Sequence, residues 1–277
     1  MYRIKRLVGM LASVAVIGIW SAVNAQPAFA TANTTCNLSQ GAGDNTWVVR
    51  NQPSSSAVTG AGATISYFDY NLCRAPIPGP LGWPNQSSSG AWVGIVNGGG
   101  SIIQVGYIKC NPNQVLGCKN VPAQDDGITI AFWAWGNDGD IFKQPWPHFL
   151  ANVTNANHTF SVYKVNRSTC YYSMSMDVGA SDFAYSTVPC STINWTPTAA
   201  QIGNEVWNSG DQLGGYSGTP QRFSSENYTN ANGKASLDVH NGPYQSGHCY
   251  PQVGFSNSSG QGDDWRSWTY VADHQAC

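Results

Sequence analysis

Glu205 is the carboxylate of this sequence that is best placed for acid–base chemistry. Only two of the 15 acidic residues are glutamates, and most aspartates lie beside Gly, Asn or Ser in segments typical of turns. Glu205 lies instead in a run with strand character, in which alternation places Gln201, Gly203, Glu205 and Trp207 on one face. A carboxylate beside an indole is partly desolvated, which favours a role as general acid or base. A half-exposed glutamate near a strand end is the alternative interpretation.

Gln104 is the second residue that could take part in a reaction or in ligand binding. It lies in a strand-like run between aliphatic neighbours and shares a face with Gly106. A buried amide needs a hydrogen-bond partner, and the missing side chain of Gly106 leaves room for one beside it.

Other chemistries have no motif here. The sequence has no Gly-x-Ser-x-Gly elbow, no phosphate-binding or dinucleotide loop and no His-Glu-x-x-His helix. His240 and His248 flank a Gly/Pro turn, and the 137–140 segment is only a fragment of a calcium loop. We therefore expect no metal site and no cofactor.

Short strands separated by turns must position these residues. Each expected strand is rich in β-branched or aromatic residues, and no window shows a sustained helical period. The expected strands are 63–70, 91–96, 101–109, 127–135, 159–165, 170–178, 200–207, 235–240, 252–256 and 267–272. Many short strands without helices predict an all-β fold, a two-sheet sandwich or jelly roll.

Three segments resemble the glutamic peptidases, or eqolisins. Ala91–Ile95 reads Ala-Trp-Val-Gly-Ile and Ile102–Gly106 reads Ile-Ile-Gln-Val-Gly, similar to the family's Ala-Trp-Val-Gly-Ile and Leu-Gln-Thr-Gly. Aromatic-rich Ala131–Gly136 looks like its Trp/Tyr-rich segment, although Ala134 stands where an acid is usual. The resemblance covers roughly residues 90–210 and implies a concanavalin A-like β-sandwich.

The resemblance also implies catalytic roles. In this family a Glu acts as general base on water and a Gln stabilises the oxyanion, so Glu205 and Gln104 are the expected catalytic pair. The family segment Ala-Glu-Trp-Ile-x-Glu can also be laid on Ala200, which puts Gln201 at the catalytic position and Glu205 at the second Glu. In that case the site holds two amides and no base.

Three functions follow from these residues. The first is a glutamic-type endopeptidase acting at acidic pH, and the second is a non-catalytic sandwich that binds carbohydrate or peptide. The third is a glycoside hydrolase, which needs a second carboxylate within about 5–10 Å of Glu205, with Asp177 and Asp182 as candidates. Residues expected to contact substrate are Trp92, Trp133, Trp135, Gln201 and Trp207.

The first 30 residues have the pattern of a cleavable secretory signal peptide. Three basic residues precede an apolar run, and Ala28-Phe29-Ala30 supplies a small-x-small cleavage site. We therefore expect a secreted protein that is not embedded in a membrane. Residues 31–90 are expected to be a loop-rich extension or pro-segment, and 91–277 the sandwich.

The net charge and the even number of cysteines are consistent with an exported protein. Without its first 30 residues the chain keeps 10 basic and 15 acidic residues, a net charge of −5, which argues against nucleic acid as a partner. We expect a monomer whose partner is an extracellular polypeptide or glycan. The eight cysteines predict a disulfide framework, and of the about 105 pairings that eight cysteines allow we expect the one that joins sequence neighbours. The expected pairs are Cys36–Cys73, Cys110–Cys118, Cys170–Cys190 and Cys249–Cys277.

Overall fold

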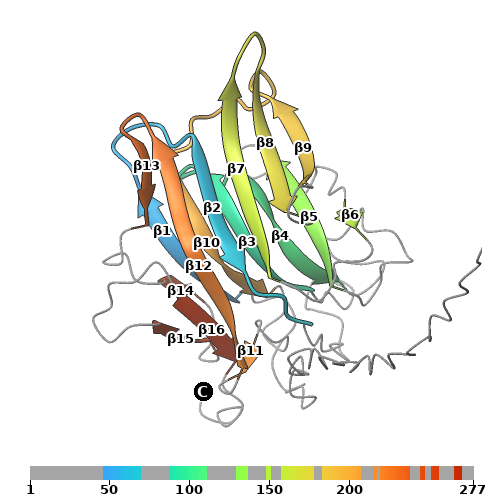
Figure 1. Ribbon diagram of the computed structural model, residues 1–277. Coiled ribbons are helices and arrows are strands. Elements are labelled where there is room, and N and C mark those ends of the chain that lie inside the picture. Colours follow the sequence, from blue (N-terminus) through green and yellow to red (C-terminus); the bar gives the residue numbers. More distant parts are fainter. Residues whose placement is uncertain are drawn as a thin grey trace, which may run out of the picture.

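The chain folds into two β-sheets packed face to face in this computed structural model (Figure 1). The structure describes residues 46–69, 88–110, 129–136, 148–150, 157–177, 183–206, 215–216, 219–237, 244–246, 251–255 and 265–269. Within these ranges all regular structure is strand, which confirms the all-β sandwich. No helix in the described ranges is long and apolar enough to cross a membrane. The expected signal peptide, residues 1–30, lies outside the described residues.

The first sheet has seven strands in the order β14-β1-β10-β3-β4-β5-β6. All pairings among its described strands are antiparallel. Its strands are β1 (Thr46–Pro53), β3 (Ser88–Val96), β4 (Ile102–Cys110), β5 (Thr129–Gly136), β6 (His148–Leu150), β10 (Ala199–Val206) and β14 (Tyr244–Ser246).

The second sheet has nine strands in the order β15-β16-β11-β12-β2-β7-β8-β9, with β13 paired to β12. It lies in front of the seven-stranded sheet in Figure 1. Its strands are β2 (Gly60–Ile65), β7 (His158–Asn166), β8 (Cys170–Asp177), β9 (Phe183–Pro189), β11 (Gly215–Tyr216), β12 (Thr219–Asn230), β13 (Gly233–Ser236), β15 (Pro251–Phe255) and β16 (Trp265–Thr269).

The sandwich begins before the boundary expected at residue 91. Strand β1 is flanked by β14 and β10 in the first sheet, and β2 is flanked by β12 and β7 in the second. Each contributes buried side chains, such as Val49 from β1 and Ile65 from β2. Residues 46–65 are therefore part of the sandwich and not an extension of it.

Alternation along each strand builds the core between the sheets. On β3, Ala91, Val93 and Ile95 point into the sandwich and are fully buried. Tyr107 of β4 packs edge-on against Phe160 of β7, with ring centroids 4.8 Å apart. Apolar burial of this kind is the main favourable contribution to folding.

A buried ion pair also links the two sheets. Arg50 of β1 and Glu226 of β12 lie 2.5 Å apart, nitrogen to oxygen, and both side chains are almost wholly buried. Pairing of β12 with β2 is interrupted between Ser224 and Asn227, and Ser225 has a φ of 55°. This irregularity is a β-bulge, and Glu226 lies within it.

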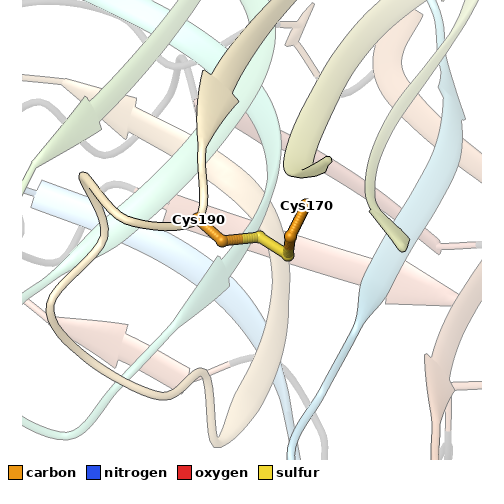
Figure 2. Close-up of a disulfide and its surroundings, with 2 residues drawn as sticks. All are labelled: Cys170 and Cys190. Atoms are coloured by element: carbon orange, nitrogen blue, oxygen red, sulfur yellow. A yellow bond between two sulfur atoms is a disulfide. The ribbon is translucent and has the colours of Figure 1, made fainter. Parts of the chain in front are cut away.

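One disulfide closes the β8–β9 hairpin (Figure 2). Cys170 begins β8 and Cys190 follows β9, and their Cα atoms are 5.4 Å apart. The prediction of Cys170–Cys190 is confirmed. The other three expected pairs involve side chains outside the described part of the chain.

Candidate functional site

The outer face of the seven-stranded sheet carries Gln104, Gln201 and Glu205. Because Val93 of β3 and Val105 of β4 point into the core, their sequence neighbours Trp92 and Gln104 point to the other side. The strand register decides how close these outward side chains lie, since residues paired across a sheet share a face.

Gln104 and Gln201 lie in one lateral row of the sheet. Gly94 of β3 pairs with Gln104 on one side and with Gln201 on the other. Asn51 of β1 extends the row beyond Gln201, and the amide nitrogen of Gln201 donates a hydrogen bond to Asn51 Oδ1 at 3.0 Å. We call Asn51, Gln201 and Gln104 the amide row.

Gly94 lies at the centre of the amide row. Two strand spacings separate the backbones of Gln104 and Gln201, which is about 10 Å. Gly94 is buried, and a Cβ there would lie 2.9 Å from the Ile103 carbonyl oxygen and 3.3 Å from Gln104 Cβ, so the missing side chain lets the strands and Gln104 pack closely between the two glutamines. Gln104 is 4% exposed, while Gln201 and Asn51 are partly exposed.

Glu205 belongs to a different row. It pairs with Gly90 of β3, which in turn pairs with Ile108 of β4. Glu205 lies four residues along β10 from Gln201, a rise of about 13 Å. The register therefore places Gln201, and not Glu205, across Gly94 from Gln104.

Trp92 occupies the row between these two. It pairs with Gly203 of β10 and Gly106 of β4, and Gly90 and Gly94 stand two residues away on its own strand. Four glycines thus surround the indole, and the amide row and Glu205 lie to either side of it. The residue is 6% exposed, and its Nε1 has no hydrogen-bond partner among the described residues.

Trp133 and Trp135 are not part of this face. Trp133 and Trp135 of β5 alternate with Ala134, and they pack against the core between the sheets. Ala134 is the residue that pairs with Gln104. Trp207 lies outside the described residues.

The carboxylates considered for a glycosidase are also separate. Asp177 ends β8 in the other sheet, where its Oδ1 accepts a hydrogen bond from the Thr159 backbone at 2.7 Å and lies 3.1 Å from His158 Nδ1. Asp182 lies outside the described residues. The structure therefore does not bring Asp177 to Glu205.

The chemistry of this face follows from its composition. The amide row contains no ionisable group, so it can donate and accept hydrogen bonds but cannot transfer a proton as a general base. Within the described strands β1, β10, β3, β4 and β5, Glu205 is the only acidic residue in the three rows centred on Trp92, and the row of Trp92 continues to His148 of β6 and Tyr244 of β14. Sequence reasoning did not identify Asn51, because only the pairing of β1 with β10 brings it beside Gln201.

Solved glutamic peptidases share this architecture. The chain is similar to scytalido-glutamic peptidase in complex with a peptide-based transition-state analogue, with a TM-score of 0.51 and 13% identity. A second structure of that peptidase, with a transition-state analogue inhibitor, gives a TM-score of 0.50 and 13% identity. Each comparison covers 83% of this chain and 98% of the peptidase. No protein-family model and no curated protein matches the sequence. The similarity establishes the eqolisin-type β-sandwich fold.

Proposed function

We propose that this protein binds extended polypeptide on the outer face of its seven-stranded sheet and does not cleave it. The observation that carries the proposal is the position of Gln201, which lies across Gly94 from Gln104. An amide there leaves the row without the carboxylate that would activate water.

Amides suit the recognition of a peptide backbone. Each glutamine offers an N–H donor and a C=O acceptor, which match the alternating carbonyl and amide groups of an extended chain. Gly94, between the two glutamines, places no side chain of its own in the path of such a ligand.

Trp92 adds apolar contact in the adjacent row. The indole is buried in an apolar cluster, and its Nε1, which has no hydrogen-bond partner among the described residues, can donate to a ligand carbonyl that reaches it. Rows on one sheet face repeat every two residues, and so do the side chains on one face of an extended peptide. A peptide running along β3 can therefore contact the amide row and Trp92 in succession.

The alternative is a glutamic-type endopeptidase in which Glu205 is the base. It is favoured by the peptidase fold and by the presence of Gln104 and Glu205 on the same face. It requires Glu205 to act on water held near Gln104, although the two residues lie in different rows. Export, as expected from residues 1–30, would place either activity outside the cytoplasm.

A paired assay tests the proposal. Denatured casein is incubated with the protein at pH 3–5 and inspected for fragments, and fluorescein-labelled casein peptides are titrated with the protein and followed by anisotropy. We expect binding without cleavage, and about tenfold weaker binding for Gln104→Ala or Gln201→Ala, which each remove hydrogen bonds to the ligand.

Asn166→Ala is the matched control, because it removes an exposed amide at the end of β7 in the other sheet. Cleavage by the wild type that disappears in Glu205→Gln would establish the peptidase instead. Absence of both binding and cleavage would refute the proposal.

A further inference from the structure

The outer face of the nine-stranded sheet carries an aromatic platform. Tyr163 of β7 pairs with Gly60 of β2, and Ser161 pairs with Gly62. A side chain added at Gly60 would collide with the Tyr163 ring, and one added at Gly62 would lie 3.2 Å from its hydroxyl. The ring therefore lies flat across the two glycines.

Hydrogen bonding holds the ring in this position. The Tyr163 hydroxyl donates to Asn227 Oδ1 of β12 at 2.9 Å, and the Asn227 amide donates to the Ser225 carbonyl at 2.9 Å. Tyr163 is partly exposed, so one face of the phenol ring packs on β2 and the other is open to solvent.

Hydroxyl groups surround the platform. Ser161 and Ser175 hydroxyl oxygens lie 2.7 Å apart, and Thr64 and Thr159 hydroxyl oxygens lie 3.0 Å apart. When one hydrogen bond joins two hydroxyl groups, one O–H remains free to donate to a ligand and lone pairs remain free to accept from it.

The platform is also uncharged. The row through Tyr163 contains Thr229, Gly60, Ser173 and Thr187, and the next row contains Asn227, Gly62, Ser161, Ser175 and Tyr185. Lys234, paired with Thr229, stands at the margin. Figure 1 shows β2, β7 and β8 side by side, with no other described strand in front of them.

We propose that this face binds a neutral polysaccharide, with the Tyr163 ring as the stacking platform and the surrounding hydroxyl and amide groups as hydrogen-bond partners. The apolar face of a pyranose ring can stack on the open face of the phenol. Sugar hydroxyls can donate and accept, so they match serine and threonine hydroxyls in either direction. A neutral ligand fits this face, because the cation that these two rows contain, Lys234, lies at their margin and not beside the Tyr163 ring.

This proposal is independent of the polypeptide site. That site lies on the opposite side of the sandwich, on the outer face of the other sheet. Either site can fail while the other is confirmed.

The experiment is sedimentation of the purified protein with microcrystalline cellulose or chitin, and affinity electrophoresis in gels that contain a soluble β-glucan. We expect retention by at least one of these neutral polymers. Tyr163→Phe keeps the ring and should retain binding, whereas Tyr163→Ala should weaken it by about tenfold.

Two further variants keep the test decisive. Ser175→Lys places a long charged side chain on the face without touching the core, and we expect it to weaken retention even if Tyr163→Ala fails to fold. Lys164→Ala is the matched control, since the exposed Lys164 lies beside Tyr163 in sequence but its ammonium lies over the Tyr172 ring, 5.9 Å from the centroid. The proposal is overturned by absence of binding to every neutral polymer, by binding to anionic polysaccharide alone, or by an equal loss in Lys164→Ala.

Discussion

Gln104 and Gln201 face each other across a single strand, and Gly94 is the residue that pairs with both. This relationship puts two amides where the family resemblance implies an amide and a carboxylate. The similarity to solved structures establishes the fold. Catalysis is a separate question, because it depends on the side chain at position 201.

Gln201→Glu should introduce acid peptidase activity. The substitution preserves side-chain length and places a carboxylate in the row of Gln104, where it can take a proton from water while the Gln104 amide stabilises the oxyanion. We expect slow cleavage of denatured casein at pH 3–5 by this variant and none by the wild type. The double variant Gln201→Glu with Gln104→Ala should be inactive, and activity that survives in it would disprove the assigned roles.

Breaking the Arg50–Glu226 ion pair should destabilise the sandwich. Glu226→Gln leaves a buried guanidinium without its counter-charge, and the loss of a partner from a buried pair costs about 3–5 kcal/mol. Urea denaturation monitored by tryptophan fluorescence measures the change. The double variant Arg50→Met with Glu226→Leu should recover much of the loss, because it removes both charges.

Reduction or removal of the Cys170–Cys190 disulfide should also lower stability. The bridge spans 20 residues, and the loop-entropy model gives about 3 kcal/mol for a loop of this length. Cys170→Ser with Cys190→Ser, compared with the wild type in urea, tests this estimate. An unchanged urea midpoint would show that the backbone hydrogen bonds between β8 and β9, and not the disulfide, hold the hairpin together.

Gly106→Ala should disrupt the central strands. A Cβ at this position would overlap the backbone of Ala91 and lie 2.7 Å from Trp92 Cα, so β3 and β4 would have to separate. Gly98→Ala is the matched control, because nothing lies within 4 Å of its added Cβ. We expect a clear loss of thermal stability only for Gly106→Ala, measured by circular dichroism, and equal losses in both would contradict the contact argument.

Stability should fall at alkaline pH. Burial raises the pKa values of Tyr67, Tyr163 and Tyr172 above the ordinary 10.0, and the nearby Asp69 charge raises that of Tyr67 further. A raised pKa means that the folded state holds the phenol proton more tightly than the unfolded state does. The resulting stabilisation is complete below pH 10 and is lost as the pH rises through the folded pKa values. Spectrophotometric titration of tyrosinate, with Asp69→Asn as a variant that should lower the pKa of Tyr67, measures the effect.

Local sequence patterns predicted much of the fold. Strands β3, β4, β7, β8 and β10 fall close to the expected ranges, because their apolar residues alternate or run together in short segments. The predictions missed β1, where Arg50 occupies an inward position that looks unsuitable for a core. Its partner Glu226 is 176 residues away, so no local pattern could reveal the compensation. They also missed β12, whose alternation is broken by the bulge at Ser225.

The sequence predicted which face of β10 carries the candidate residues, but not which of them lies beside Gln104. Alternation correctly places Gln201 and Glu205 on the same side of β10, but it cannot say which of them lies beside Gln104. That depends on the register between β10 and β3, which pairs segments more than 100 residues apart. The sequence alone also cannot say which face of the sheet Trp133 and Trp135 occupy. Their face follows only from the pairing of Ala134, which lies between them, with Gln104.

The amide row also has an evolutionary consequence. Glutamine and glutamate codons differ only in their first base, so a single nucleotide substitution at position 201 exchanges a neutral amide for a carboxylate of the same shape. Because Gln201 is partly exposed and faces away from the core, such a change would leave the sandwich intact. On the proposed assignment, binding and hydrolysis are therefore one mutational step apart on this scaffold.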